Sequence, residues 1–277
     1  MKFKVLISVA AVAAASTSPA SAQDRDSHFD GLYISGIAGI AAQGNDRADT
    51  LVFDTDRDGT FGDTVSTAAG ANAFSTGFCN GAANGGTSAA GCAKDRDRVE
   101  YGGRIGLDIR NGDFVIGGLF EVTRNNSGDF TSGFSTTPAS YTIGRHLDHA
   151  FALRARAGFT PGGGALFYAT GGGSYSKINH TFSTSNTANS FTQVNDGKYV
   201  WGWQAGGGAE IMLTDNVSLG LEYLYNRHRD SKYRVDVGAG TAPATNPFLI
   251  TSGGTGIRPL DTNFDYHSLR ASVSLQF

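Results

Sequence analysis

Apolar and polar residues alternate with a period of two along several separate stretches of the chain. Residues 98–110 show the pattern most clearly, because apolar Ile105 and Leu107 are interleaved with charged Arg104 and Asp108. Successive side chains of a strand point to opposite faces of a sheet, so this period predicts a strand with one apolar and one polar face. Seven further stretches share the pattern.

The connections between these stretches alternate between short turns and long polar segments. The short turns lie at 111–113, 161–164 and 214–216, and all three contain turn-forming residues such as Gly, Asn, Asp or Pro. Bacterial outer-membrane barrels have the same asymmetry, with short periplasmic turns and longer outer loops. The sequence therefore predicts an all-β fold, an eight-stranded antiparallel up-and-down transmembrane β-barrel with long extracellular loops. The predicted strands are 29–42, 98–110, 114–123, 146–159, 166–176, 199–213, 217–225 and 264–277, and the predicted polar loops are about 43–97, 125–145, 177–197 and 227–262.

The first residues have the layout of a secretory signal peptide. A basic start is followed by an uncharged apolar run, 5–15, and by small residues that end in Ala-Ser-Ala at 20–22. The apolar run is too short to span a bilayer as a helix, which takes about 20 apolar residues. We therefore expect residues 1–22 to be a cleaved signal peptide and residues 23–277 to form the exported barrel in the bacterial outer membrane.

The composition agrees with a barrel better than with a soluble helical domain. Glycine accounts for 39 of the 277 residues, and there are 18 Phe and 10 Tyr against 2 Met. A negative mean hydropathy fits strands on which lipid-facing and lumen-facing residues alternate. The formal net charge is −3, or about −5 once Lys2 and Lys4 leave with the signal peptide, and this sign argues against a nucleic-acid partner.

The polar faces of the predicted strands carry as many cations as anions. In a small closed barrel this face is enclosed, so its charges must pair with one another, whereas the polar face of a soluble sandwich meets water. Two interpretations remain open: a salt-bridged plug that fills the barrel, or a narrow gated ion path. The plug is favoured because eight strands leave an interior just wide enough for side chains to fill. The predicted interior charge network consists of Arg104, Asp108, Glu121, Arg154, Arg156, Glu210, Glu222 and Arg270.

Two cysteines, Cys79 and Cys92, lie in the first long polar segment. Export places them in an oxidising compartment, and no other thiol of the sequence competes for either one. We therefore predict a disulfide that closes a short loop. The absence of a neighbouring histidine in the sequence favours this disulfide over a zinc site.

The same segment contains the first half of a calcium-loop pattern, because residues 54–59 read D-x-D-x-D-G. In such a loop alternate carboxylates point at one centre, and the glycine permits a sharp turn. The usual closing acid is missing at the twelfth position, where Val65 stands, although Asp63 lies two residues earlier. Two interpretations stay open: a weak calcium site, or a solvated acidic turn. The candidate ligands are Asp54, Asp56, Asp58 and Asp63, and the sequence predicts no other cofactor.

Five stretches resemble small bacterial outer-membrane barrels of the OmpA-type and opacity-type porin superfamily, especially its alphaproteobacterial members. Residues 29–36 resemble the aromatic-x-G-x-Y-x-x-G opening of these proteins, and residues 153–159 resemble their L-R-x-R-x-G-aromatic strand. Residues 167–173, 202–210 and 219–225 match in the same order. The resemblance implies an eight-stranded barrel that the barrel assembly machinery inserts after recognising its last strand. The expected assembly signal is Leu269, Val273, Leu275 and Phe277.

The resemblance implies no single activity, because members of the superfamily serve as structural envelope proteins, narrow channels, adhesins or immune-evasion antigens. The outer loops are longer than those of the family. Functions that family members carry in their loops are therefore the least reliable guide to this chain. We interpret the chain as a structural, surface-exposed outer-membrane β-barrel protein with a largely plugged polar interior. Two alternatives remain: a narrow porin for small solutes, and an adhesin that acts through its long outer loops.

Two groups of residues at predicted strand ends contain the side-chain types of a hydrolase. A protease or acyl hydrolase needs a nucleophile or an activated water held beside a histidine and a carboxylate. Neither group matches a motif of outer-membrane enzymes, so we predict that the protein is not an enzyme. The two groups are His146, Asp148 and His149, and Asp265, His267 and Ser268.

Outer-membrane lipid and lipopolysaccharide are the expected partners of the lipid-facing side. Tryptophan and tyrosine residues near the strand ends predict an aromatic girdle at the membrane interface. Arg227, His228 and Arg229 follow a predicted strand and are either contacts for lipopolysaccharide phosphates or a solvated loop base. The predicted girdle consists of Trp201, Trp203, Tyr223, Tyr225 and Phe277.

Overall fold

The computed structural model describes residues 28–44, 50–95 and 97–277, and nearly all of its regular structure is β. The predicted signal peptide, residues 1–22, lies outside the described residues. In the part of the chain that the structure describes, no helix is long and apolar enough to cross a membrane. The strands are β1 (Gly31–Gln43), β2 (Leu51–Asp54), β3 (Phe78–Asn80), β4 (Ala82–Ala83), β5 (Cys92–Ala93), β6 (Arg98–Asn111), β7 (Phe114–Asn125), β8 (Gly128–Ser135), β9 (Ala139–Phe159), β10 (Ala165–Thr184), β11 (Ser190–Val194), β12 (Lys198–Met212), β13 (Val217–Arg229), β14 (Arg234–Gly238), β15 (Thr255–Pro259) and β16 (Asn263–Gln276), and short 3-10 helices lie at η2 (Ser88–Ala90) and η3 (Pro161–Gly163).

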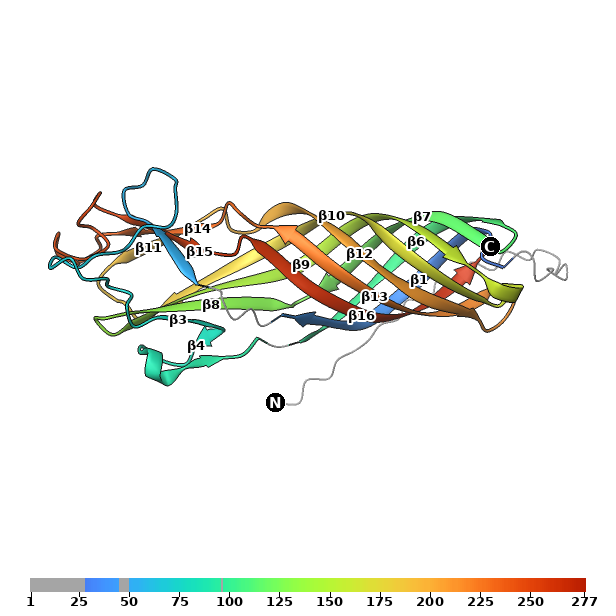
Figure 1. The fold of residues 1–277 in the computed structure, drawn as a ribbon, viewed down its shortest axis with the longest axis horizontal. Coiled ribbons are helices and arrows are strands. Elements are labelled where there is room, and N and C mark those ends of the chain that lie inside the picture. Colours follow the sequence, from blue (N-terminus) through green and yellow to red (C-terminus); the bar gives the residue numbers. More distant parts are fainter. Residues whose placement is uncertain (1–27, 45–49, 96) are drawn as a thin grey trace.

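Eight of these strands form a closed antiparallel barrel, as the sequence predicts. Their order around the barrel is β1, β6, β7, β9, β10, β12, β13 and β16, and each pairs with the next. The pairing of β16 with β1 closes the ring, so the barrel has no free edge. Figure 1 shows the tilted strands around one long axis, with the C-terminus at the end that carries the short turns.

The hairpin of β6 and β7 fixes which residues face the interior. Asn111 pairs with Phe114 across the turn, and Gly112 has φ +62°, a conformation that glycine adopts without steric cost. The register then places Arg104 opposite Glu121, so both charges lie on the same face. A turn of this length leaves little freedom for the strands to slip.

The apolar residues on the other face of the barrel are exposed. Leu107 is 54 % exposed, Leu153 69 % and Trp201 72 %; the residues on either side of Leu107 and Leu153 are buried, and those on either side of Trp201 are half-buried. An apolar belt of this extent is unfavourable in water and suits contact with lipid tails. The predicted alternation is therefore confirmed, with apolar side chains outside and charged side chains inside.

One predicted face is wrong in the first half of β9. Period-two alternation places Leu147 on the outward face, but its side chain is fully buried. The register shifts where Lys177 pairs with His149 and Ile178 pairs with Leu147, which leaves Asp148 without a partner residue on β10. This β-bulge exchanges the two faces of β9, because one extra residue changes the parity of a strand.

The four segments predicted as polar loops contain ordered strands, which corrects the predicted strand boundaries. β9 and β10 have 21 and 20 residues. A membrane strand needs only about 9–11 residues, so both continue beyond the membrane. β8 and β3 extend the wall beside β9. A separate sheet, here called the outer sheet, contains β11, β14, β15 and β2 in that order and lies at the end of the molecule opposite the C-terminus (Figure 1).

The outer sheet packs on the extended barrel strands through an apolar core of its own. The ring of Tyr141, on β9, lies 5.3 Å from that of Phe74 and 5.4 Å from that of Phe248. The strands of this sheet have only four or five residues, so any alternation is short, as in β14, where Val235 and Val237 are buried and alternate with polar residues. The buried residues of this core are Leu51, Phe53, Val65, Ala73, Phe74, Ala139, Tyr141, Ile143, Tyr233, Val235, Val237, Phe248 and Ile257.

The predicted disulfide between Cys79 and Cys92 is present. Cys79 lies on β3, which pairs with β8, and Cys92 lies on β5, which pairs with β4. The bond therefore ties the small β4–β5 hairpin to the extended barrel wall.

Candidate functional site

The barrel interior gathers the charges that the sequence places on the polar strand faces. All eight predicted residues are between 1 and 5 % exposed. The structure adds a ninth, Glu100, which is 0 % exposed, so all four glutamates of the chain are buried in the barrel. Glu100, Arg104 and Asp108 are all even positions of β6 and therefore lie on the same face. The alternation in the sequence could have identified Glu100 as an inward residue.

Glu222, on β13, has the largest number of partners in the interior. Its Oε1 accepts hydrogen bonds from Nη2 of Arg104 at 2.8 Å and from Nε of Arg270 at 2.9 Å. Its Oε2 accepts bonds from Nη1 of Arg154 at 3.3 Å and from the hydroxyl of Tyr168 at 3.0 Å. Hydrogen bonds between charged groups are about twice as strong as neutral ones, so they fix this carboxylate firmly.

Glu121, on β7, binds the same three arginines. Nε of Arg104, Nη2 of Arg154 and Nη2 of Arg270 donate to its Oε2 at 3.0, 2.8 and 2.9 Å. Nη1 of Arg270 also lies 3.5 Å from Oε1 of Glu100. Three cations thus face three acids, and the charges balance only when Glu100 is included. This set is called the middle layer below: Glu100, Arg104, Glu121, Arg154, Glu222 and Arg270.

A second charged cluster lies closer to the short turns. Arg156, on β9, bonds to Asp108 through Nε at 2.8 Å and also through Nη2, and to Glu210 through Nη1 at 3.1 Å. Its guanidinium carbon lies 4.4 Å from the ring centre of Tyr33 and 5.2 Å from that of Tyr168. Tyr168 also bonds to the middle layer, so it connects the two clusters.

Apolar side chains lie on both sides of the charges. Phe29 and Leu166 belong to a buried cluster at the short-turn end, and Leu147, Ile178 and Phe264 belong to another at the opposite rim. Groups enclosed in this way are shielded from water, which strengthens the attraction within each ion pair and makes an unpaired charge costly. The bulge in β9 contributes to this arrangement, because it turns Leu147 inward.

Gly39, on β1, allows Arg270 to lie against the barrel wall. A Cβ at residue 39 would stand 2.5 Å from the Cβ of Arg270 and 2.6 Å from its Cα, whereas a Cβ at Gly36 would meet nothing within 4 Å. We expect Gly39→Ala to lower the free energy of unfolding by about 1–3 kcal/mol, because backbone atoms must move. Gly36→Ala, in the same strand, is the matched control and should change it by less than about 0.5 kcal/mol. Equilibrium urea unfolding in lipid vesicles measures both, and equal losses would contradict this role of Gly39.

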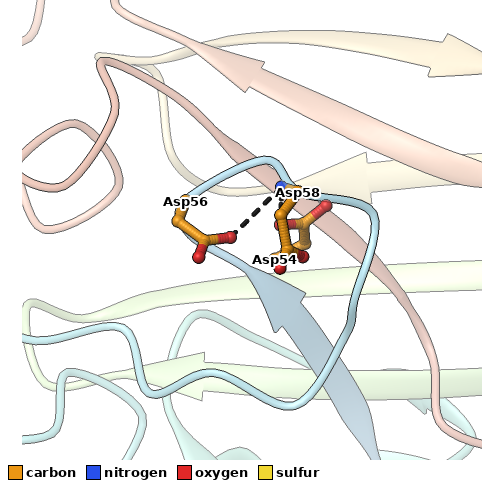
Figure 2. A group of neighbouring side chains, drawn as sticks. All are labelled: Asp54, Asp56 and Asp58. Carbon is orange, nitrogen blue, oxygen red and sulfur yellow. Dashed lines mark hydrogen bonds between the residues drawn. The ribbon is translucent and has the colours of Figure 1, made fainter.

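Three of the four predicted calcium ligands come together after β2. One carboxylate oxygen from each of Asp54, Asp56 and Asp58 lies within 4.8 Å of the others (Figure 2). Asp63 does not join them, which corrects the predicted ligand set. It accepts hydrogen bonds from the backbone N–H and the hydroxyl of Thr55, at 2.8 and 3.0 Å, and these bonds lower the pKa of Asp63.

Backbone amides of the same loop explain the arrangement of the three aspartates. The N–H of Asp58 donates to Asp54 and to Asp56 at 3.1 Å each, and the N–H of Gly59 donates to Asp54 at 3.0 Å. Aspartates commonly stabilise turns through such bonds without an ion. Calcium binding by this loop therefore stays a prediction.

Comparison with known proteins connects this barrel to the bacterial cell envelope. No family model matches the chain. Two curated relatives, the 31 kDa outer-membrane immunogenic proteins of Brucella melitensis and Brucella suis, are 37 % identical over 125 residues. The match covers 45 % of this chain and 44 % of each relative, so the chain spans less than half the length of the curated relatives it matches. The crystal structure of the outer membrane protein OprG from Pseudomonas aeruginosa aligns with a TM-score of 0.51 at 12 % identity, over 92 % of this chain and 100 % of OprG.

The closed ring of eight strands and its lipid-facing belt agree with both comparisons. The protein is a small outer-membrane β-barrel. The predicted fold and the predicted location in a Gram-negative outer membrane are confirmed. The likeness to OprG at this identity concerns the fold alone.

Aromatic residues of the outer-membrane barrel bind the polar groups of one predicted rim site. The hydroxyl of Tyr223 lies 2.7 Å from Nδ1 of His267, and the hydroxyl of Tyr225 donates to Asp265 at 2.7 Å. Ser268 has the opposite parity on β16 and is fully buried. The candidate hydroxyl is therefore not brought together with the histidine and the carboxylate.

The other predicted rim site, His146, Asp148 and His149, does not come together as a group either. Nδ1 of His149 lies 3.4 Å from Asp148, and its Nε2 lies 2.7 Å from the hydroxyl of Tyr199. His146 lies on the far side of the bulge and packs edge-on against the ring of Phe130.

One of the three predicted lipopolysaccharide contacts is wrong. His228 is fully buried inside the barrel, where its Nε2 lies 3.0 Å from Oγ of Ser174 and 2.7 Å from Oγ of Ser176. Its even position on β13 places it on the inward face together with Glu222. The flanking Arg227 and Arg229 lie at odd positions of β13, which face the lipid, and the side chain of Arg227 is 42 % exposed.

The predicted assembly signal also faces outward. Leu269, Val273, Leu275 and Phe277 are all exposed on the last strand or directly after it. Recognition of these residues by the assembly machinery stays a prediction.

Proposed function

We propose that the barrel is a structural, surface-exposed component of the outer membrane that carries a folded extracellular part and passes no solutes. The observation that carries this proposal is the pairing of the interior charges, which are at most 5 % exposed and lie between two apolar clusters. An open polar channel needs charges that are hydrated along a continuous path. Paired side chains that fill eight strands instead fix the shape of the barrel.

Several ion pairs would have to separate together before the lumen could open. Nη2 of Arg154 lies 2.8 Å from Glu121 and 3.2 Å from Glu222, so no single movement releases it. Leaving one buried charge unpaired costs roughly 3–5 kcal/mol, and a gate in the middle layer would have to supply this several times.

Conductance separates this proposal from the narrow porin. We expect planar bilayers that contain the refolded protein to show no stable conductance steps, with detergent-only bilayers as the control. Reproducible steps in the wild-type protein that change size in Arg154→Ala would place an ion path in the lumen. That result would favour the porin over the structural role.

The extracellular part supports adhesion as a second candidate function. The outer sheet and its apolar core form a folded surface above the membrane, and both curated relatives are named as immunogenic. A fixed surface of this kind can present a constant set of contacts to a neighbouring cell. Binding of intact barrel to cells, compared with a variant that lacks β14 and β15, tests this function, and equal binding would argue against it.

Lipopolysaccharide is the lipid partner that the surface supports best. We propose that Arg227 and Arg229 contact its phosphates, because they lie on the lipid-facing side at the extracellular end of β13. No catalytic step enters the proposed function, since the hydroxyl of Ser268 and the ring of His267 lie on opposite faces of β16.

A further inference from the structure

A cavity of about 430 Å³ lies on the extracellular part, away from the charges of the barrel. Its walls come from the loop after β2, from the turn before β12, and from β14 and β15 with the residues that precede β14. These segments are far apart in the sequence and are held together by the pairings within the outer sheet. The volume is that of a small-ligand site and exceeds what a single inorganic ion fills.

Most of the cationic side chains that line the cavity form no ion pair with a described residue. Arg57, Lys232, Arg234 and Arg258 line it. Arg234 is paired, because its Nε lies 2.7 Å from Oδ1 of Asp236. Among the residues that the structure describes, the other three cations have no ion pair.

The acids that line the cavity already have partners within the chain. Both oxygens of Asp54 accept backbone N–H groups, one from Asp58 and one from Gly59. Oδ1 of Asp58 accepts the N–H of Thr60 at 2.6 Å. The lining carries four cations and three acids, so it keeps one positive charge in excess, and Arg57, Lys232 and Arg258 are the cations to which no acid of the lining is bound.

Arg258, on β15, is held in position at the wall of the cavity. Its guanidinium carbon lies 4.2 Å from the ring centre of Phe61, and its Nη1 donates to the carbonyl of Ser231 at 3.5 Å. Its Nε is enclosed by protein atoms, whereas no hydrogen bond of its Nη2 is found among the described residues. A guanidinium that is held in place and keeps Nη2 free can donate to an acceptor in the cavity.

We propose that this cavity binds an anionic sugar, with its oxyanion between Arg258, Arg57 and Lys232. The oxyanion supplies an acceptor for Nη2 of Arg258, and the two exposed cations, Arg57 and Lys232, add attraction at the mouth. Phe61, which is half-buried at the wall of the cavity, offers an apolar surface to a sugar ring. A carboxylate, a phosphate or a sulfate offers the same chemistry to an arginine fork. The site is independent of whether the barrel conducts.

Isothermal titration calorimetry on the full-length refolded barrel in detergent tests the proposal. The probes are glucuronate, glucose 1-phosphate and glucose 6-sulfate, with neutral glucose and inorganic phosphate for comparison. We expect at least one anionic sugar to bind about tenfold more tightly than neutral glucose, because charged hydrogen bonds contribute most of the affinity. The three anionic probes identify which oxyanion fits, and inorganic phosphate shows how much the ring contributes.

Substitutions at the mouth of the cavity separate binding from folding. Arg57 and Lys232 are exposed, so the double variant Arg57→Gln, Lys232→Gln should fold normally and bind about tenfold more weakly. Arg258→Lys keeps the charge but removes the fork and should also weaken binding. Lys94→Gln removes an exposed cation that does not line the cavity and should bind as the wild type does. Equal affinity of the double variant and the wild type, or no heat with any anionic sugar, would overturn the proposal.

Discussion

Replacing Glu222 by glutamine is expected to lower the free energy of unfolding by about 3–5 kcal/mol, the usual cost of removing one partner from a buried charge cluster. Glu222 accepts hydrogen bonds from Arg104, Arg154 and Arg270. The substitution preserves the size of the side chain but removes its charge. Three buried arginines then face two acids, and the apolar clusters at both ends keep water from compensating.

Urea unfolding of the barrel in lipid vesicles, followed by tryptophan fluorescence and by the mobility of the folded form on gels, measures this loss. Asp215→Asn is the matched control, because it removes an acid from an exposed turn and should change the free energy by less than about 0.5 kcal/mol. Tyr168→Phe removes only the hydroxyl that donates to Glu222 and should cost about 1 kcal/mol. A loss for Glu222→Gln no larger than that of Asp215→Asn would show that the interior is hydrated.

The barrel and most of its interior charges could be predicted because local rules determine them. Period-two alternation assigns each residue of β6 and β7 to a face, and the turn at Gly112 sets their register. Arg104 and Glu121 then have to meet inside the barrel. His228 follows the same parity rule and was misplaced because its neighbours Arg227 and Arg229 suggested a polar loop.

The parts that escaped prediction depend on contacts between distant segments. The bulge at Asp148 leaves no mark in the composition of β9, yet it turns Leu147 inward. The outer sheet consists of short strands, and Val235 becomes a core residue only because Ile257 and Phe53 pair beside it. A strand of four or five residues shows at most a short alternation, and this does not identify the strand with which it pairs.

Arg270→Met is expected to destabilise the barrel by several kcal/mol, and adding Glu100→Gln is expected to restore part of that loss. Nη1 of Arg270 lies 3.5 Å from Glu100, and no other arginine pairs with Glu100 among the described residues. Methionine in place of Arg270 therefore leaves Glu100 buried without a cation, at a cost of about 3–5 kcal/mol. Neutralising Glu100 in the same molecule removes this unpaired charge and leaves two cations opposite two acids in the middle layer.

A double-mutant cycle in urea unfolding measures the coupling between these two residues. If the middle layer is balanced by Glu100, the double variant should be more stable than Arg270→Met alone by about 1–3 kcal/mol. Glu100→Gln alone should be destabilising, because Arg270 then lacks one of its three acids. Losses that simply add would mean that Glu100 takes no part in the charge balance. A positive coupling would instead identify Glu100, on β6, as the acid that balances the third arginine of the middle layer.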